Sequence, residues 1–580
     1  MVKKENDAVV KVAGRQTLDL GSYRQAVEVR LDGFKDADIG GRLWRKDASL
    51  WSGNAKEHSQ VGDSLGWLDA AATMAANQDL LLKLRQEVLA AGFRRVVHMG
   101  MGGSSLAPLV MAKILPGKNQ GLPLTVLDTT DSATILKIEK EAPLTETIFI
   151  VASKSGTTAE PRAFAEYFFR RVSEAKGGRA GENFIAITDP GSPLAQSAAG
   201  RDFRHVFLNF PDIGGRYSAL SFFGLVPAAL AGADTEALLK QALGMQRACA
   251  AEVPVQANPG LVLGAALGEL ALQGRDKVTF LSAESIAPLG MWLEQLLAES
   301  TGKKGRGLLP VAGEAVGSPG VYGTDRLFVY LWAGGDPALE AAVDKLKAAG
   351  QPVVTIRIDE PYQLGQEFFR WEAATAVAGI VLGVNPFDQP NVQESKDNTN
   401  RLLDQVAKTG ELPPETPLLV EAPLGVYYES FKPPVVTVAE AIGSFLSEGR
   451  PGGYLALMAY LAEDKATAHV LARLQAALRD RLHLAVTVGF GPRFLHSTGQ
   501  FHKGGPAGGL FLQLTCDDAE DALIPGAAYG FSVFKQAQAL GDFMALRRHG
   551  RKVMRVHLGG DPKEGLARVE EIVRNVKLDF

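Results

Sequence analysis

The chain has 580 residues, of which 46% are hydrophobic, and this length predicts a globular protein of about two to four domains. Lysine and arginine total 61 against 65 aspartate and glutamate, so the net charge of −4 excludes a surface of the kind that binds nucleic acid. Any anionic ligand must therefore be held by local groups, which favours a small metabolite over a polymer.

The cysteines and the apolar segments bear on the cellular compartment. Cys249 and Cys516 are far apart and lack the paired spacing of a disulfide framework or a zinc site. The first residues are charged, no hydrophobic signal region follows them, and no run of about 18 uninterrupted apolar residues occurs. We expect a soluble, cytoplasmic protein without a metal site.

Short β-branched runs alternate with longer alanine- and leucine-rich segments of helical period, and this alternation predicts an α/β fold of mostly parallel sheets flanked by helices. In the first half, strands are expected at residues 95–99, 124–127, 147–152, 184–188 and 206–210. They predict a first doubly wound lobe over residues 61–232, preceded by an N-terminal extension of residues 1–60.

A second series of strands is expected at residues 278–282, 327–332, 353–358, 484–488, 510–514 and 553–558. We assign all of them to one second lobe with two parts, residues 276–409 and 481–580. Between the lobes, the alanine-rich stretch 235–272 predicts a helical connection over residues 233–275. Many prolines between residues 410 and 434 indicate an irregular excursion, so residues 410–480 are expected to be an insertion in the second lobe.

Two loops at strand ends of the first lobe carry candidate ligand-binding groups. Residues 98–105, HMGMGGSS, lead into an apolar helix, and their glycines would let backbone N–H groups approach an anion, although they do not fit the dinucleotide fingerprint. Residues 153–160, SKSGTTAE, bring four hydroxyls to a helix start, which suits a phosphate group. Either loop could instead be a tight turn or a helix cap without a ligand.

Two further segments carry charged candidates. Residues 212–221, DIGGRYSALS, place Arg216 where it could hold an oxyanion through two parallel N–H bonds, or simply pair with Asp212. Residues 292–303, WLEQLLAESTGK, predict a helix that carries Gln295 and Glu299 on one face. A carboxylate among apolar residues suits a general base, although a surface glutamate near a helix end is commoner.

Together these four segments, in this order, resemble the phosphoglucose isomerase family, whose members contain two sugar-isomerase (SIS) lobes. Residues 385–396, NPFDQPNVQESK, are similar to the lysine-bearing loop of that family, so the resemblance covers residues 94–396. It implies an aldose-ketose isomerase that interconverts glucose 6-phosphate and fructose 6-phosphate in glycolysis and gluconeogenesis, with no metal and no cofactor.

The histidine segment departs from the usual order of the family. There the catalytic histidine lies between the glutamate and the lysine loop, but no histidine occurs between Glu299 and Lys396. The matching string, FLHSTGQFHKGG at residues 494–505, is similar to the isomerase half of fused transaldolase and glucose-6-phosphate isomerase proteins. The resemblance implies that His496 is catalytic, with His502 as the alternative. His496 could act in cis, or in trans within a homodimer.

The resemblance also implies a role for each candidate residue. His496 and Lys396 would open the sugar ring, Glu299 would carry the proton between the first two carbons, and Arg216 would stabilise the enediolate. The phosphate would be anchored by Ser153, Ser155, Thr157, Thr158 and the backbone of Lys154, and the sugar hydroxyls would be oriented by Gly103, Ser104, Gln295 and Gln389.

Two other functions remain open at this stage. A phosphosugar-binding SIS regulator without catalysis would use the same phosphate loop, but it needs no equivalent of Glu299, Lys396 and His496. A broader isomerase would also accept mannose 6-phosphate, and the hydroxyls of Ser300 and Thr301 could enlarge its tolerance for sugar hydroxyls.

Overall fold

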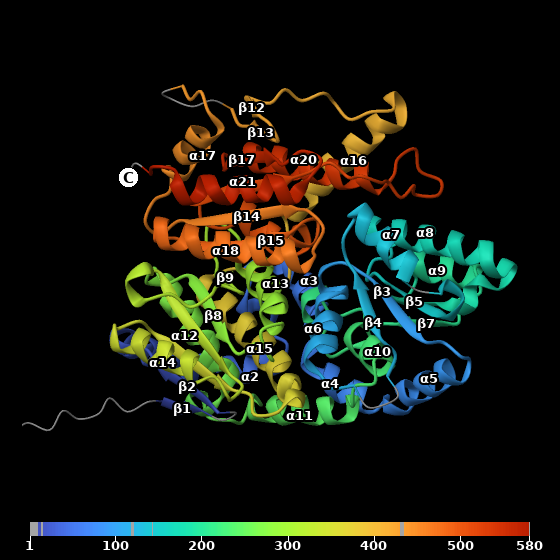
Figure 1. Ribbon diagram of the computed structural model, residues 1–580. Coiled ribbons are helices and arrows are strands. Elements are labelled where there is room, and N and C mark those ends of the chain that lie inside the picture. The colour runs from blue at the N-terminus through green and yellow to red at the C-terminus, as the bar shows by residue number, and fades with distance from the viewer. Residues whose placement is uncertain (1–9, 13–14, 118–120, 142, 430–433, 579–580) are drawn as a thin grey trace, which may run out of the picture.

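The computed structural model describes residues 10–12, 15–117, 121–141, 143–429 and 434–578. Strands within these residues form three sheets, most of whose strands run parallel, and helices flank each sheet. The expected α/β class is thereby confirmed. Figure 1 shows the three lobes that result, in blue to cyan, in green to yellow, and in orange to red. No helix in the described part of the chain is long and apolar enough to cross a membrane.

The first sheet has the order β4-β3-β5-β6-β7, and all its pairings are parallel. Its strands are β3 (Arg95–Met99), β4 (Leu124–Leu127), β5 (Thr147–Ala152), β6 (Phe184–Thr188) and β7 (His205–Leu208). The first four coincide with the expected ranges, and the last is shifted by one or two residues. Helices α5 (Gln78–Ala90), α6 (Leu106–Ile114), α7 (Ser132–Glu141), α8 (Ala159–Lys176), α9 (Pro193–Gly200) and α10 (Phe222–Leu230) accompany this sheet.

The second sheet has the order β1-β2-β11-β10-β8-β9. Strands β8 (Lys277–Ser282), β9 (Leu309–Val311), β10 (Arg326–Trp332) and β11 (Val353–Arg357) run parallel. From the N-terminal segment, β2 (Gln16–Asp19) pairs antiparallel with β11, and β1 (Val10–Val12) pairs with β2. The residues before the first lobe therefore complete the sheet of the second lobe, a long-range pairing that local sequence patterns do not reveal.

Helices of the second lobe build the largest apolar core together with part of the first lobe. The expected helical connection is present as α11 (Thr235–Ala248) and α12 (Pro259–Leu272), which both pack against α15 (Leu364–Leu382). Helix α13 (Leu289–Thr301) is buried along most of its length and carries the candidate Glu299. The remaining helices of this part are α1 (Arg24–Asp36), α2 (Ile39–Trp44), α3 (His58–Gly62), α4 (Trp67–Ala75) and α14 (Pro337–Ala348).

The third sheet corrects the expectation that strands near residues 484–488, 510–514 and 553–558 belong to the second lobe. Its order is β12-β13-β17-β16-β14-β15, with β14 (Tyr454–Tyr460), β15 (Ala485–Phe490), β16 (Gly509–Thr515) and β17 (Lys552–His557) parallel. Strand β14 is fully buried between β16 and β15, inside the segment 410–480 that was expected to be an insertion. With this strand, the C-terminal segment has enough buried strands to cover a core of its own.

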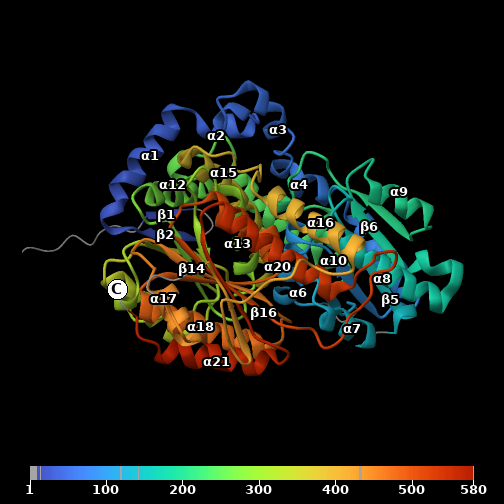
Figure 2. The same ribbon diagram turned by 90° about the horizontal axis from the view of Figure 1, so that it is seen from above.

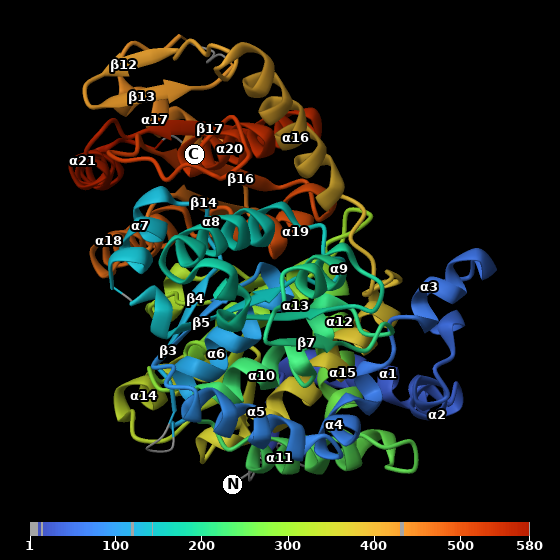
Figure 3. The same cartoon turned by 90° about the vertical axis from the view of Figure 1, so that its right-hand side faces the viewer.

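The proline-rich stretch that was expected to be irregular contains a short hairpin, β12 (Leu419–Glu421) and β13 (Leu424–Tyr427), which extends the edge of the third sheet. Helices α17 (Val438–Leu446), α18 (Lys465–Leu482), α19 (Gly499–Gly504), α20 (Phe531–Arg548) and α21 (Pro562–Asn575) belong to this lobe. Figure 3 shows the third lobe stacked above the other two.

The third lobe contacts both others through helices. Helix α16 (Val392–Thr409), which follows the second lobe in the chain, packs along α20, as Figure 2 shows from above. The short 3₁₀ helix η11 (Arg493–His496) contacts η4 (Gly102–Ser104) of the first lobe and α13 of the second. The three lobes therefore meet where β3 and β5 end and where the candidate histidine lies.

Candidate active site

The glycine-rich loop after β3 is in close contact with the loop that carries Arg216. A Cβ atom on Gly103 would lie 2.0 Å from the carbonyl oxygen of Gly215, so this approach is open only to glycine. Gly102 has a φ of +53°, in the left-handed region that favours glycine. Gly103 thus brings the first loop against residues 215–216, whereas Gly102 lies against Gln295 and His496. Ser104 lines the same site.

The loop after β5 presents hydroxyl groups just before helix α8 begins. The hydroxyl of Ser153 donates to Thr158 Oγ1 at 3.0 Å, and the hydroxyls of Ser155 and Thr157 lie 2.8 Å apart. The Lys154 ammonium turns aside to pair with Asp189 at 2.5 Å, which leaves its backbone as the part next to the hydroxyls. This set of hydroxyls at a helix start suits an anion with several oxygens.

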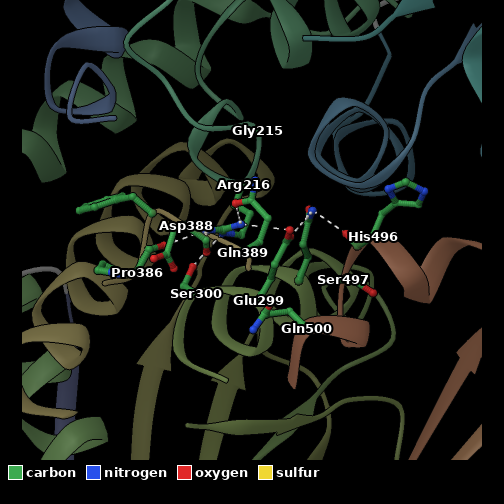
Figure 4. A network of polar contacts seen from close by, with 12 residues as sticks. Gly215, Arg216, Glu299, Ser300, Pro386, Asp388, Gln389, His496, Ser497 and Gln500 are labelled. Atoms are coloured by element: carbon green, nitrogen blue, oxygen red, sulfur yellow. Dashed lines mark hydrogen bonds and ion pairs between the residues drawn. The ribbon is translucent and has the colours of Figure 1, made fainter. Parts of the chain in front are cut away.

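Arg216 is fixed by contacts from the second lobe. Its Nη1 atom lies 3.0 Å from Glu299 Oε1 and also donates to Gln389 Oε1, while Nε donates to Ser300 Oγ. The expected alternative, a pair with Asp212, is not formed, although the structure describes both residues. Both Arg216 and Glu299 are buried, and Figure 4 shows their ion pair within the network of polar contacts.

Lys303, like Arg216, contacts the loop that carries Asp388 and Gln389. Its ammonium donates to the carbonyl oxygens of Ser300 and Asn385 and pairs with Asp388 at 3.0 Å. Burial, followed by the positive charge of Arg216, lowers the pKa of Lys303 to about 7. Arg216 also donates to the carbonyl oxygen of Asp388, so the side chains of Lys303 and Arg216 both bind the loop that carries Gln389.

Gln295 joins helix α13 to the histidine segment. Its side-chain amide donates to Glu299 Oε2 at 3.0 Å and to the carbonyl oxygen of His496 at 2.8 Å. Gln295 and Glu299 thus share a helix face, as their spacing predicted, and the face is buried rather than exposed. The second and third lobes are in hydrogen-bonding contact at this point.

The His496 ring is turned toward the first lobe, where it meets a buried carboxylate. His496 Nε2 lies 2.8 Å from Glu160 Oε1, which also accepts a hydrogen bond from the Gln538 amide at 2.7 Å. Burial by itself would raise the pKa of Glu160, but the nearby His496 ring lowers it, and the net pKa lies below the ordinary value. The Glu160 carboxylate is therefore ionised and orients the imidazole.

One cavity of about 300 Å³ brings most of the candidates together. It is lined by residues of all three lobes: Met101, Gly102, Gly103, Ser104, Lys154, Ser155, Thr158, Asp189, Gly215, Arg216, Gln295, Glu299, Gln389 and His496. The first lobe supplies hydroxyls and the Arg216 guanidinium, the second the Glu299 carboxylate, and the third the His496 imidazole. A single chain thus brings hydroxyls, a guanidinium, a carboxylate and an imidazole around one space.

Lys396 and Thr157 line an adjoining cavity of about 350 Å³ instead. The two cavities share Ser155, Thr158 and His496, so the imidazole stands between Lys396 and the space that Glu299 faces. Ser153 lines neither cavity and contacts the site through Thr158. The structure therefore brings Lys396, Thr157 and Ser153 near the site, but not into the cavity of Glu299.

His502, the alternative histidine, lies outside the site. It is buried among Tyr454, Phe494 and Phe511, and neither ring nitrogen has a hydrogen-bond partner among the described residues. Burial lowers the pKa of His502 well below the ordinary value, so the ring is neutral. His502 is thus a core residue rather than an exposed one.

Sequence reasoning missed two groups at the site. Glu160 ends the string SKSGTTAE, but it was given no role because its partner His496 is 336 positions away. Asp189 lines the cavity beside Lys154, and burial raises its pKa despite the opposing effect of the lysine. A polar residue at the carboxyl end of β6 was the signal that could have found it. In the described ranges, no cluster of three or more residues suited to bind a metal is found.

The chain is similar in sequence to known proteins. A sequence model of a family described as phosphoglucose isomerase matches residues 87–308, a range that includes Arg216 and Glu299 and ends before Lys396 and His496. The chain is 32% identical over 366 residues to the glucose-6-phosphate isomerase of Rubrobacter xylanophilus, which covers 54% of this chain and 84% of the relative.

Two further comparisons extend the likeness. The glucose-6-phosphate isomerase of Thermosynechococcus vestitus is 29% identical over 423 residues, which are 65% of this chain and 78% of the relative. The crystal structure of a hypothetical protein from Thermus thermophilus has a TM-score of 0.57 at 24% identity and covers 67% of this chain and 99% of its own. This last likeness concerns the fold alone.

Proposed function

The chain belongs to the phosphoglucose isomerase family, and from this premise we propose that it interconverts D-glucose 6-phosphate and D-fructose 6-phosphate, as an enzyme of glycolysis and gluconeogenesis. The proposal is carried by one observation: the Glu299 carboxylate and the hydroxyl-bearing loop after β5 line the same cavity. A phosphate held on that loop would bring the carbon chain of the sugar toward a proton acceptor.

In this proposal, the phosphate is bound at the start of α8. Ser155 and Thr158 contact it directly, since both line the cavity, and the backbone of Lys154 adds an N–H group. Ser153 and Thr157 act through their hydroxyl partners Thr158 and Ser155, which they hold in place.

Ring opening is assigned to His496. Glu160 orients the imidazole through the 2.8 Å contact, so that the ring can exchange a proton with the sugar oxygen. Lys396 supports this step from the adjoining cavity, where a positive charge lies on the other side of the imidazole. No cofactor takes part in these steps.

Proton transfer between the first two carbons is assigned to Glu299. It removes a proton from one carbon and returns it to the next, and Arg216 stabilises the charge that develops on the enediolate oxygens. The Arg216 guanidinium is already held by Ser300, Gln389 and the backbone of Pro386, so it need not reorganise during the reaction. Gly103, Ser104, Gln295 and Gln389 line the cavity where the sugar hydroxyls would lie.

The two other candidate functions receive less support. A non-catalytic regulator has no need for the buried pair of Glu299 and Arg216. A broader isomerase for mannose 6-phosphate was linked to the hydroxyls of Ser300 and Thr301. Thr301 Oγ1 is instead bound to the Leu297 carbonyl and the Leu308 amide, and Ser300 accepts from Arg216.

An isotope experiment tests the proposed function. Fructose 6-phosphate is incubated with the protein in heavy water, and the products are followed by proton NMR. We expect glucose 6-phosphate that carries deuterium at its second carbon, because the proton passes through a group that exchanges with solvent. Recovery of unlabelled fructose 6-phosphate alone would contradict the proposal, and labelled mannose 6-phosphate in comparable amount would favour the broader isomerase.

A further inference from the structure

A second large cavity lies beside the candidate active site, on the neighbouring face of helix α13. Its volume is about 560 Å³, within the range of roughly 300–1,000 Å³ that is usual for small-molecule sites. Met291 and Glu294 point to it from α13, whereas Gln295 and Glu299 face the active site. At 3.6 residues per turn, Glu294 and Glu299 are about 140° apart around the helix axis.

The walls of this cavity are mainly apolar and come from the second and third lobes, with a contribution from α6. They include Leu106, Pro288, Met291, Ala312, Met458, Val488, Phe490 and Phe494. Ala468 and Ala472 of α18 are exposed and lie at its opening. An apolar ligand body would therefore be well covered on entering.

The charged groups on the lining favour a cation. The carboxylates are Glu284, Glu294 and Glu463, and the positive groups are Lys113 and Arg493. Arg493 is already engaged, because it pairs with Glu463 at 2.6 Å and with Asp128, which lies outside the cavity. Glu284 and Lys113 are exposed, and Glu463 is paired with Arg493, which leaves Glu294 as the acidic group within the cavity.

Glu294 is an unusual group for an apolar wall. No ion pair to it is found among the described residues, and its carboxylate accepts a backbone hydrogen bond from Ala312. Burial raises the pKa of Glu294 to about 8, against the smaller opposing effects of that hydrogen bond and of Arg493. A carboxyl group in such surroundings gains most from a partner that brings a positive charge into the cavity.

We propose that this cavity binds a small organic cation whose charged nitrogen pairs with Glu294 while its apolar body lies against the walls from α13, β14 and β15. An anion such as a second phosphosugar does not fit, because Arg493 is already paired with Asp128 and Glu463. The segment 493–498 lines this cavity and also carries His496 to the active site, so a bound cation would contact the support of the histidine.

Three probes of equal shape and different charge test the proposal by isothermal titration calorimetry: benzylamine, benzyl alcohol and benzoate. We expect benzylamine to bind at least about tenfold more tightly than benzyl alcohol, and benzoate not to bind measurably. Equal affinity of benzylamine and benzyl alcohol, or benzoate as the best ligand, would overturn the proposal without the need for any variant.

Two variants place the binding in this cavity. Glu294→Gln keeps the shape of the side chain, so the preference for benzylamine over benzyl alcohol should fall to about one. Ala472→Phe should abolish binding of both probes by filling the opening, whereas Ala466→Phe, an exposed control on the same helix and outside the lining, should bind them as the wild type does. Unchanged benzylamine binding by Ala472→Phe, or a preserved tenfold preference in Glu294→Gln, would refute the site.

Discussion

Arg493 and Asp128 form a two-pronged ion pair that joins the third lobe to the first. The guanidinium Nε and Nη2 atoms donate to the two carboxylate oxygens of Asp128 at 2.7 and 2.8 Å. Asp128 directly follows β4, and Arg493 begins the 3₁₀ helix that ends at His496. Since both partners are largely buried, this pair fixes the position of the imidazole relative to the hydroxyl-bearing loop after β5.

We predict that Asp128→Asn slows turnover by impairing ring opening. Loss of the charge leaves Arg493 without its bidentate partner, which costs about 3–5 kcal/mol of stability for a buried pair and lets the histidine segment shift. A displaced imidazole should lower kcat for the cyclic substrate by about tenfold while KM changes little. Steady-state kinetics and the rate of anomer exchange measured by NMR check both expectations.

The control for this variant is Asp69→Asn, which removes an exposed ion pair with Lys46 and should leave kcat unchanged. If Asp128→Asn lowers only the melting temperature and the anomer exchange rate stays as in the wild type, then Arg493 and Asp128 have a structural role alone.

We predict that Glu299→Gln abolishes isomerisation and preserves binding. Glutamine can still accept the hydrogen bond from Arg216, so the cavity should keep its shape, but it cannot accept the carbon-bound proton. We expect kcat to fall by about 10³-fold or more, with the dissociation constant of fructose 6-phosphate within about threefold of the wild type. Glu236→Gln, on the exposed side of α11, is the control; substantial turnover by Glu299→Gln would exclude this residue as the base.

We predict opposite outcomes for the two histidines of the late segment. His496→Ala should lose more activity with the cyclic than with the open-chain substrate, since the imidazole that Glu160 orients is assigned to ring opening. His502→Phe should keep activity within about twofold, because its ring nitrogens make no hydrogen bond to the residues that the structure describes and its cage of Tyr454, Phe494 and Phe511 is aromatic. The reverse result would exchange the two assignments.

Local sequence patterns predicted the strands of the first lobe and the candidate residues in its loops. Strand β5 is a fully buried run of mostly apolar residues followed by hydroxyls, so both the strand and the hydroxyl-bearing loop were predictable from neighbouring residues. Strand β14 was not predictable in this way, because its Ala, Leu and Met residues have no clear strand pattern and a proline-rich stretch precedes it. Without β14, the strands around it were assigned to the wrong sheet.

The contacts between lobes were beyond prediction from one sequence. The pair of Arg493 and Asp128 spans 365 positions, and the pair of His496 and Glu160 spans 336. Such contacts depend on how the folded lobes pack against one another. No periodicity or local motif in the sequence predicts that packing. The residue types of the site were therefore predictable from the motifs, while the order in which they contact one another was not.

We predict that the folded protein loses stability in mild acid because of His98. It lies in β3 with no exposed surface, and its Nε2 donates to the Ser104 carbonyl at 2.6 Å. Burial lowers the pKa of His98 to about 4, against smaller opposing effects of that hydrogen bond and of Asp128. The unfolded chain therefore binds more protons than the folded protein between about pH 6.5 and pH 4, so stability falls as the pH falls through this window.

The stability that His98 contributes and that is lost between about pH 7.5 and pH 5 is about 2 kcal/mol. His98→Gln keeps a donor for Ser104 and cannot titrate, so its free energy of unfolding should fall by about 2 kcal/mol less than that of the wild type over this interval. Guanidinium denaturation at the two pH values measures the difference, and equal losses in both proteins would show that His98 is not the acid-sensitive group.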